Sequence, residues 1–113
     1  MKYFAIGAVL AILVTGASAH SKIETTIPAD GAVLASAPAE IDLTFGKDIR
    51  LTRVVLSHQD GAAVPLDLGS QTQFGRGFTV PLQSLGQGVY RIEWRGLGMD
   101  GHAMTGTFTF AVE

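Results

Sequence analysis

The 113-residue sequence contains no cysteine. Disulfide bonds therefore cannot staple the fold, and thiolates cannot hold a metal ion. A metal site in this chain would have to use histidine, methionine, carboxylate or a free terminal amine. Histidine is itself scarce, because the chain has only His20, His58 and His102.

Charge of either sign is also sparse. Eight Lys and Arg residues against ten Asp and Glu residues give a formal net charge of −2, and the basic residues are scattered. Without a basic run in the sequence, we expect no nucleic-acid binding. The sequence also lacks a nucleophile elbow, a phosphate loop, a Ser-His-Asp signature and evident paired carboxylates, so we expect that the protein is not an enzyme.

The one long apolar run, residues 4–14, is too short for a membrane anchor. It has about 11 residues, whereas a spanning helix needs roughly 20. It follows Lys2 and leads into Ala17-Ser18-Ala19, which is the pattern of a cleaved secretory signal. We therefore expect a signal peptide over residues 1–19 and export to the periplasm. Removing the first 19 of the 113 residues leaves 94, a single soluble domain that begins at His20.

Alternation of apolar and polar residues at period two dominates the remaining sequence. It predicts half-buried strands over residues 40–45, 89–94 and 107–112, with the aromatic ring of Trp94 in the core. Further strands are expected over residues 22–26, 51–57 and 78–82, and turns over residues 28–31, 59–61, 75–77 and 86–88. Short strands separated by Gly and Pro turns indicate an all-β sandwich or barrel.

His20, Asp100 and His102 form the candidate metal site. Cleavage after Ala19 would free the α-amine of His20, which can close a six-membered chelate together with ring atom Nδ1. Asp100 and His102 are two apart, so an extended segment would project both to one face. Three nitrogens and one oxygen suit a tetragonal Cu(II) ion, and we expect one ion per chain.

Each of these residues also has a structural interpretation. Asp100-Gly101 is a common turn pair ahead of a strand, and a histidine after a turn is often a plain surface residue. His58 lies in a polar hairpin tip, and we interpret it as a solvated loop residue. Met99 and Met104 flank the Asp100–His102 pair, and we interpret them as packing residues.

The sequence resembles the CopC-type periplasmic copper-binding proteins. The resemblance covers essentially the whole chain after residue 19, and it depends on the order of several segments. These are His20 after the signal, Thr26-Ile27-Pro28-Ala29-Asp30-Gly31-Ala32, residues 37–45, residues 88–94 and Asp100-Gly101-His102.

The resemblance implies a seven-stranded, Ig-like Greek-key sandwich that binds Cu(II) through His20, Asp100 and His102. It also implies a role in copper homeostasis or resistance as a carrier or buffer, often beside a membrane partner of the CopD type. We expect a monomer. Some members place an additional acid ligand where this chain has Lys47, and some carry a Met- and His-rich loop that residues 66–78 lack. The resemblance therefore implies a Cu(II)-only member.

Two other functions stay open. An amino-terminal histidine chelate is also similar to the copper centre of oxidative polysaccharide-cleaving enzymes. The domain could alternatively be a metal-free Ig-like interaction module.

Overall fold

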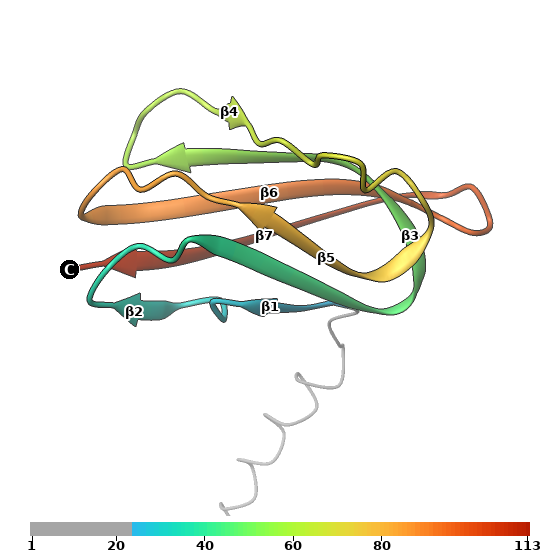
Figure 1. Cartoon of the computed structure of the whole chain (residues 1–113), viewed down its shortest axis with the longest axis horizontal. Coiled ribbons are helices and arrows are strands. Elements are labelled where there is room, and N and C mark those ends of the chain that lie inside the picture. The colour runs from blue at the N-terminus through green and yellow to red at the C-terminus, as the bar shows by residue number, and fades with distance from the viewer. Residues whose placement is uncertain (1–23) are drawn as a thin grey trace, which may run out of the picture.

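The computed structural model describes residues 24–113, and this part of the chain forms seven strands and no helix. The strands are β1 (Glu24–Ile27), β2 (Ala32–Leu34), β3 (Glu40–His58), β4 (Val64–Pro65), β5 (Gly75–Pro81), β6 (Gly88–Gly98) and β7 (Ala103–Val112) (Figure 1). Over the same residues, no helix has the length and apolarity needed to cross a membrane.

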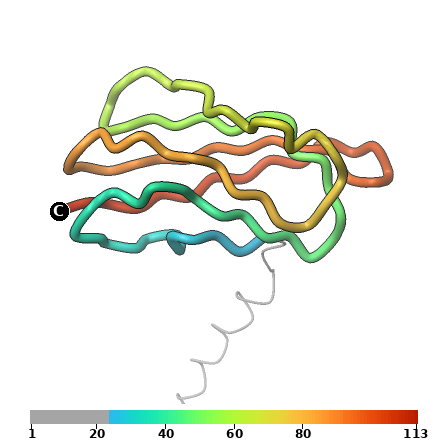
Figure 2. The backbone as a smooth tube through the Cα atoms, viewed as in Figure 1, coloured from blue at the N-terminus to red at the C-terminus, as the bar shows by residue number. Residues whose placement is uncertain are grey.

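Strand β3 belongs to both layers of the fold. Its first part pairs with β1 and β5, whereas its second part pairs with β4 and with β6, which continues through β7 to β2. The chain runs along β3 to one end of the molecule, bends there and returns, as the tube in Figure 2 shows. The bend falls where the register with β5 shifts, between Thr44 and Ile49. The predicted Ig-like Greek-key β-sandwich is confirmed.

The core lies between the two layers and is built from the alternating residues. Ile41, Leu43 and Phe45 of β3 are 3% exposed or less, as are Tyr90 and Ile92 of β6. Polar residues between them point outward, which is the pattern expected of strands with one buried face. The prediction of these half-buried strands is confirmed.

Trp94 occupies the core as predicted, and β7 makes room for its indole at Gly106. The ring meets Phe45 edge-on, with centroids 5.0 Å apart. A Cβ atom placed on Gly106 would overlap the indole atoms Nε1, Cε2 and Cζ2. Trp94 and Gly106 are direct cross-strand partners, so a glycine at this position allows the large ring to lie flat across β7.

Several predicted boundaries were wrong. Residues 40–45 and 51–57 lie on one continuous strand, because the alternation breaks at Gly46–Asp48 without ending the β conformation. Residues 75–77 were predicted as a turn but begin β5. The short strands β2 and β4 were not predicted, since three and two residues are too few for a periodic signal.

Candidate metal site

The predicted site residues Asp100 and His102 lie in the tight turn that joins β6 to β7. The amide of Gly98 donates to the carbonyl of His102 at 2.9 Å, and the amide of Gly101 donates to the carbonyl of Gly98 at 2.9 Å. Gly101 has φ of 86°, a conformation that glycine adopts without a steric penalty. The interpretation of Asp100-Gly101 as a turn pair is therefore confirmed.

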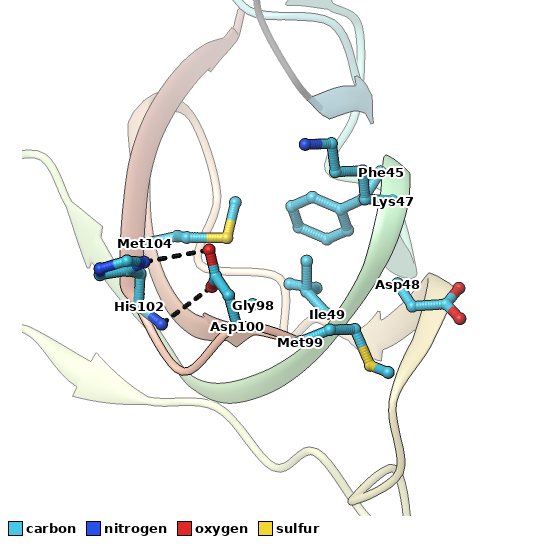
Figure 3. Close-up of a pocket in the computed structure, with 9 residues that line it drawn as sticks. All are labelled: Phe45, Lys47, Asp48, Ile49, Gly98, Met99, Asp100, His102 and Met104. Atoms are coloured by element: carbon cyan, nitrogen blue, oxygen red, sulfur yellow. Dashed lines mark hydrogen bonds and ion pairs between the residues drawn. The ribbon is translucent and has the colours of Figure 1, made fainter.

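The turn brings the carboxylate of Asp100 onto His102. Oδ1 of Asp100 accepts the backbone N–H of His102 at 3.0 Å, and Oδ2 lies 3.0 Å from ring atom Nδ1 (Figure 3). The expectation that the two residues converge is correct, although its reason was wrong. They meet because the Asp100 side chain bonds the backbone two residues further on, as Asp side chains commonly do in turns. The segment is therefore a turn and is not extended.

This contact fixes which nitrogen of His102 is available. An ionised carboxylate only accepts hydrogen bonds, so Nδ1 carries the proton when the ring is neutral. The lone pair is then on Nε2, which forms no hydrogen bond within residues 24–113. A carboxylate that holds one ring nitrogen while the other binds the ion is the usual arrangement around a metal-bound histidine.

The same contact shifts the pKa values of both side chains. The hydrogen bond to His102 holds the pKa of Asp100 below its usual value, assisted by the backbone N–H of the same residue. The hydrogen bond to Asp100, reinforced by its charge, raises the pKa of His102. Both side chains are well exposed, so water screens the pair, and its effect is to orient the imidazole more than to stabilise the fold.

A pocket of about 420 Å³ opens beside this pair. One wall is the β6–β7 turn with Met104, and the facing wall is the bend of β3. Figure 3 shows these two walls, with Phe45 and Ile49 opposite Asp100. The lining residues are Phe45, Lys47, Asp48, Ile49, Gly98, Met99, Asp100, His102 and Met104. The pocket is therefore an apolar cup whose polar groups stand at the rim.

The β3 wall is the part of the site that sequence reasoning missed. The sequence indicates only that Lys47 cannot serve as a carboxylate ligand, and it gives Asp48 no role. The signal available was the break in alternation after Phe45, which marks the bend. Asp48 forms an ion pair with Arg76, at 3.2 Å between Oδ1 and Nε.

The structure describes two of the three predicted ligands. Asp100 and His102 come together, whereas His20 lies outside the described residues. Within residues 24–113, no group of three or more His, Cys, Asp or Glu side chains could hold a metal ion. The described part of the chain therefore offers a two-residue site, which needs further donors to complete it.

His58 is not the solvated loop residue that was predicted. It ends β3, and its ring packs against Tyr90 with centroids 4.8 Å apart. Its Nε2 lies 2.8 Å from the carbonyl oxygen of Gln87 and can donate to it. The register of β3 with β6 places His58 directly opposite Tyr90, a pairing that sequence alone did not reveal.

The two methionines differ. Met104 is half-buried and packs against the core, as predicted, and it also forms part of the pocket wall. Met99 is 69% exposed, so its interpretation as a packing residue was wrong.

A model of the CopC domain matches residues 23–113 of this chain. The chain belongs to the CopC family. This confirms the resemblance found in the sequence. The match spans the entire sandwich, including the β6–β7 turn that carries Asp100 and His102.

Two curated copper resistance relatives align over most of their length, whereas a third relative is much longer than this chain. The copper resistance protein C of Escherichia coli is 28% identical over 86% of this chain and 84% of its own. The protein of the same name from Pseudomonas syringae pv. tomato is 29% identical over 97% of this chain and 91% of its own. The copper transport protein CutJ of Bacillus subtilis is 28% identical over 83% of this chain, which corresponds to 18% of CutJ.

Solved structures show the same CopC fold. The crystal structure of CopC from Methylosinus trichosporium OB3b superposes with a TM-score of 0.63 at 22% identity, over 78% of this chain and 88% of that one. PcoC, a methionine-rich copper resistance protein from Escherichia coli, gives a TM-score of 0.56 at 24% identity, over 83% and 99%.

Proposed function

We propose that this CopC-family protein binds one Cu(II) ion per chain and acts in the periplasm as a carrier or buffer in copper homeostasis or resistance. The ligands in this proposal are the α-amine and ring of His20, together with Asp100 and His102. The observation that carries the proposal is the Asp100–His102 pair at the rim of the apolar pocket, with no hydrogen bond from residues 24–113 to Nε2 of the imidazole. The copper resistance relatives support the choice of metal.

The place where β1 begins supports the part assigned to His20. β1 starts at Glu24, which pairs with Phe45, a residue of the pocket wall. His20 precedes Glu24 by four residues, and four residues reach at most about 14 Å. A chain entering β1 therefore starts within reach of the pocket. Its terminal amine can complete the site, for which the described residues supply two ligands.

The donor set explains the preference for the oxidised ion. Amine and imidazole nitrogens with a carboxylate oxygen favour Cu(II) in tetragonal geometry, whereas thiolates and dense methionine clusters favour Cu(I). In the metal-free protein both oxygens of Asp100 are engaged with His102, so Asp100 orients the imidazole. To ligate an ion on Nε2, the carboxylate must leave Nδ1, because the two ring nitrogens point in opposite directions.

Copper titration with paired histidine variants tests the proposal. His102→Ala should lower Cu(II) affinity by more than about 100-fold, since removing even an outer-shell partner of a metal ligand costs 10–100-fold. His58→Ala should leave affinity within about twofold, because its ring is engaged with Tyr90 and Gln87. Native protein should show one Cu(II) and a nitrogen-rich tetragonal spectrum by electron paramagnetic resonance. Equal effects of the two variants would disprove the site, and the absence of binding would favour a metal-free interaction module.

A copper-dependent oxidative enzyme is the alternative use of the same chelate. The relatives are named for copper resistance and transport, which favours a non-enzymatic role. Polysaccharide-cleaving activity would also call for exposed aromatic rings, and Phe74 is the one exposed Phe, Tyr or Trp within residues 24–113. A peroxide-dependent oxidation assay on the copper-loaded protein separates the two functions, because only an enzyme would turn over substrate.

The proposal also includes a delivery route. We infer that residues 1–19 are removed on export, that residues 20–113 act as a monomer, and that copper passes to or from a transporter of the CopD type. CutJ supports this association, since a region similar to this chain forms part of a copper transport protein. Amino-terminal sequencing and mass measurement of the exported protein test the cleavage, and sedimentation tests the monomer.

A further inference from the structure

The outer face of the sheet formed by β6, β7 and the second part of β3 concentrates the positive charge of the chain. We name it the arginine face. It carries four exposed arginines and one glutamate, together with hydroxyl side chains from β7. In register these are Arg50 and Arg53 on β3, Arg91, Glu93 and Arg95 on β6, and Thr105, Thr107 and Thr109 on β7. A face with four cations and one anion contrasts with the formal charge of −2 for the whole chain.

Two of these arginines are placed directly opposite each other. The register of β3 with β6 shifts between Leu51 and Arg53, and beyond this bulge Arg53 pairs with Arg95. Like charges directly opposite on neighbouring strands are destabilising. Bulges are also a common means of re-aiming a side chain near a functional site.

No carboxylate of the described residues neutralises this pair. Glu93 is the nearest candidate along β6, but its Oε2 is bonded to Nε of Arg91 at 3.0 Å. Within residues 24–113, neither Arg53 nor Arg95 forms an ion pair. The free protein therefore keeps an unfavourable arrangement of two unpaired guanidinium groups, which an external anion would relieve.

The surface beside the two arginines is hollowed. A shallow depression of about 290 Å³ is lined by Arg53, Arg95, Thr105 and Thr107, and also by Glu93, whose carboxylate is paired with Arg91. Guanidinium N–H groups and threonine hydroxyls are all hydrogen-bond donors, and the planar fork of arginine matches the two oxygens of a carboxylate. The depression thus has the donors and the room to accept a carboxylate.

We propose that the arginine face docks an acidic segment of a partner protein, with one of its carboxylates seated between Arg53 and Arg95. A protein is favoured over a membrane surface. Val89 and, on the neighbouring strand β2, Val33 are the large exposed apolar side chains on the outer face of this sheet. Two valines offer little to insert into a bilayer, and stable membrane anchoring needs a second signal besides charge. The depression shares no residue with the pocket beside His102, so a partner and a metal ion can be held together.

A fluorescent acidic peptide tests the docking surface. The probe is a labelled ten-residue peptide of alternating glutamate and glycine, and its binding is followed by fluorescence anisotropy on metal-free protein. Native protein should bind it, and higher salt should weaken the binding. Arg95→Gln should lower the affinity about tenfold, as expected for loss of one charge-assisted hydrogen-bonded contact. Arg76→Gln is the matched control: it removes the same charge from β5, outside the face, and should change the affinity less than about twofold.

A second readout separates docking from folding. Because Arg95 opposes Arg53 in the free protein, Arg95→Gln should raise the melting temperature slightly while it weakens peptide binding. If Arg95→Gln and Arg76→Gln weakened peptide binding equally, the effect would come from net charge alone. That result would overturn the proposal.

Two further results would also overturn it. One is Arg95-dependent binding to phosphatidylglycerol vesicles without peptide binding, which would identify a membrane surface. The other is self-association that Glu40→Gln abolishes. Glu40 lies on the outer face of the other sheet, so this result would identify the partner as a second copy of the chain. None of these measurements needs copper, so the result does not depend on the metal site.

Discussion

Nδ1 of His102 lies 3.0 Å from Oδ2 of Asp100 across the β6–β7 turn. The carboxylate thereby sets both the tautomer and the direction of the imidazole, with Nε2 left for an ion. The same aspartate also holds the backbone of His102 through Oδ1, so the two residues form one unit built by a four-residue turn.

Asp100→Asn should lower the pKa of His102 toward its ordinary value. The native carboxylate favours the imidazolium through a hydrogen bond and its charge, and asparagine removes the charge. Titration of the ring by NMR in metal-free protein measures the change. Cu(II) affinity should fall by at least about 10–100-fold in the variant, because Asp100 is both a proposed ligand and the orienting partner of His102. An unchanged His102 pKa would show that the pair does not persist in solution.

The direction of these shifts defines a pH window for the pair. The pKa of His102 is raised, so its contribution to stability is full below the unfolded value of about 6.5 and is lost as pH rises through the raised pKa. The pKa of Asp100 is lowered, so its contribution is full above about 3.9 and is lost as pH falls through the lowered pKa. Copper behaves differently: acidification below the raised pKa of His102 protonates the ligand, and affinity should fall steadily with pH.

One added glycine before His20 should abolish the amino-terminal chelate. The addition leaves every side chain unchanged but converts the α-amine into a peptide nitrogen, which is not a basic lone-pair donor. Cu(II) affinity should fall at least as far as in His20→Ala, which keeps a free amine, and thermal unfolding should be unchanged. Isothermal titration of the processed proteins measures the affinities, and a thermal melt of each protein measures the unfolding. Native-like affinity in the extended protein would exclude the amine as a ligand.

His58→Ala should destabilise the fold by about 1–2 kcal/mol, because it removes a ring packed against Tyr90 and a hydrogen bond to the Gln87 carbonyl. His102→Ala serves as the opposite control: this exposed residue should cost less than about 0.5 kcal/mol in metal-free protein. Urea unfolding should show the larger loss of stability in His58→Ala, whereas the copper titration should show the larger loss of affinity in His102→Ala. A stable His58→Ala variant would restore the interpretation of His58 as a solvated residue.

Gly106→Ala should destabilise the protein by about 1–3 kcal/mol, since the new methyl group would overlap the Trp94 indole in a packed core. Gly77→Ala in β5 is the matched control, because a Cβ at that position meets nothing within 4 Å. Urea unfolding measures both, and indole fluorescence reports the packing around Trp94. Equal stability of the two variants would mean that β7 shifts freely away from the ring.

Cu(I) should bind much more weakly than Cu(II). The described chain offers Met99 and Met104 near the pocket, but Met99 is largely exposed and no thiolate exists. Competition with a Cu(I) chelator measures the affinity, and Met104→Leu should change it little. Tight Cu(I) capture that Met104→Leu removes would contradict the Cu(II)-selective proposal.

The sequence alone determined the class of fold and most of the core, and it identified Asp100 and His102 as candidate ligands. Alternation at period two specified which side chains of residues 40–45 and 89–94 are buried, because a strand has only two faces. The Asp100-Gly101-His102 motif could be recognised in the sequence because its contacts are local and lie within a single turn. The order of segments identified the CopC family.

The tertiary structure decided what depends on pairing between distant strands. It placed the bend of β3 opposite the turn that carries His102, which creates the pocket, and it set His58 against Tyr90 across the β3–β6 ladder. It also opposed Arg53 to Arg95, 42 positions apart by residue number. None of these contacts has a local signal, because one shifted residue in a strand register reassigns every facing pair.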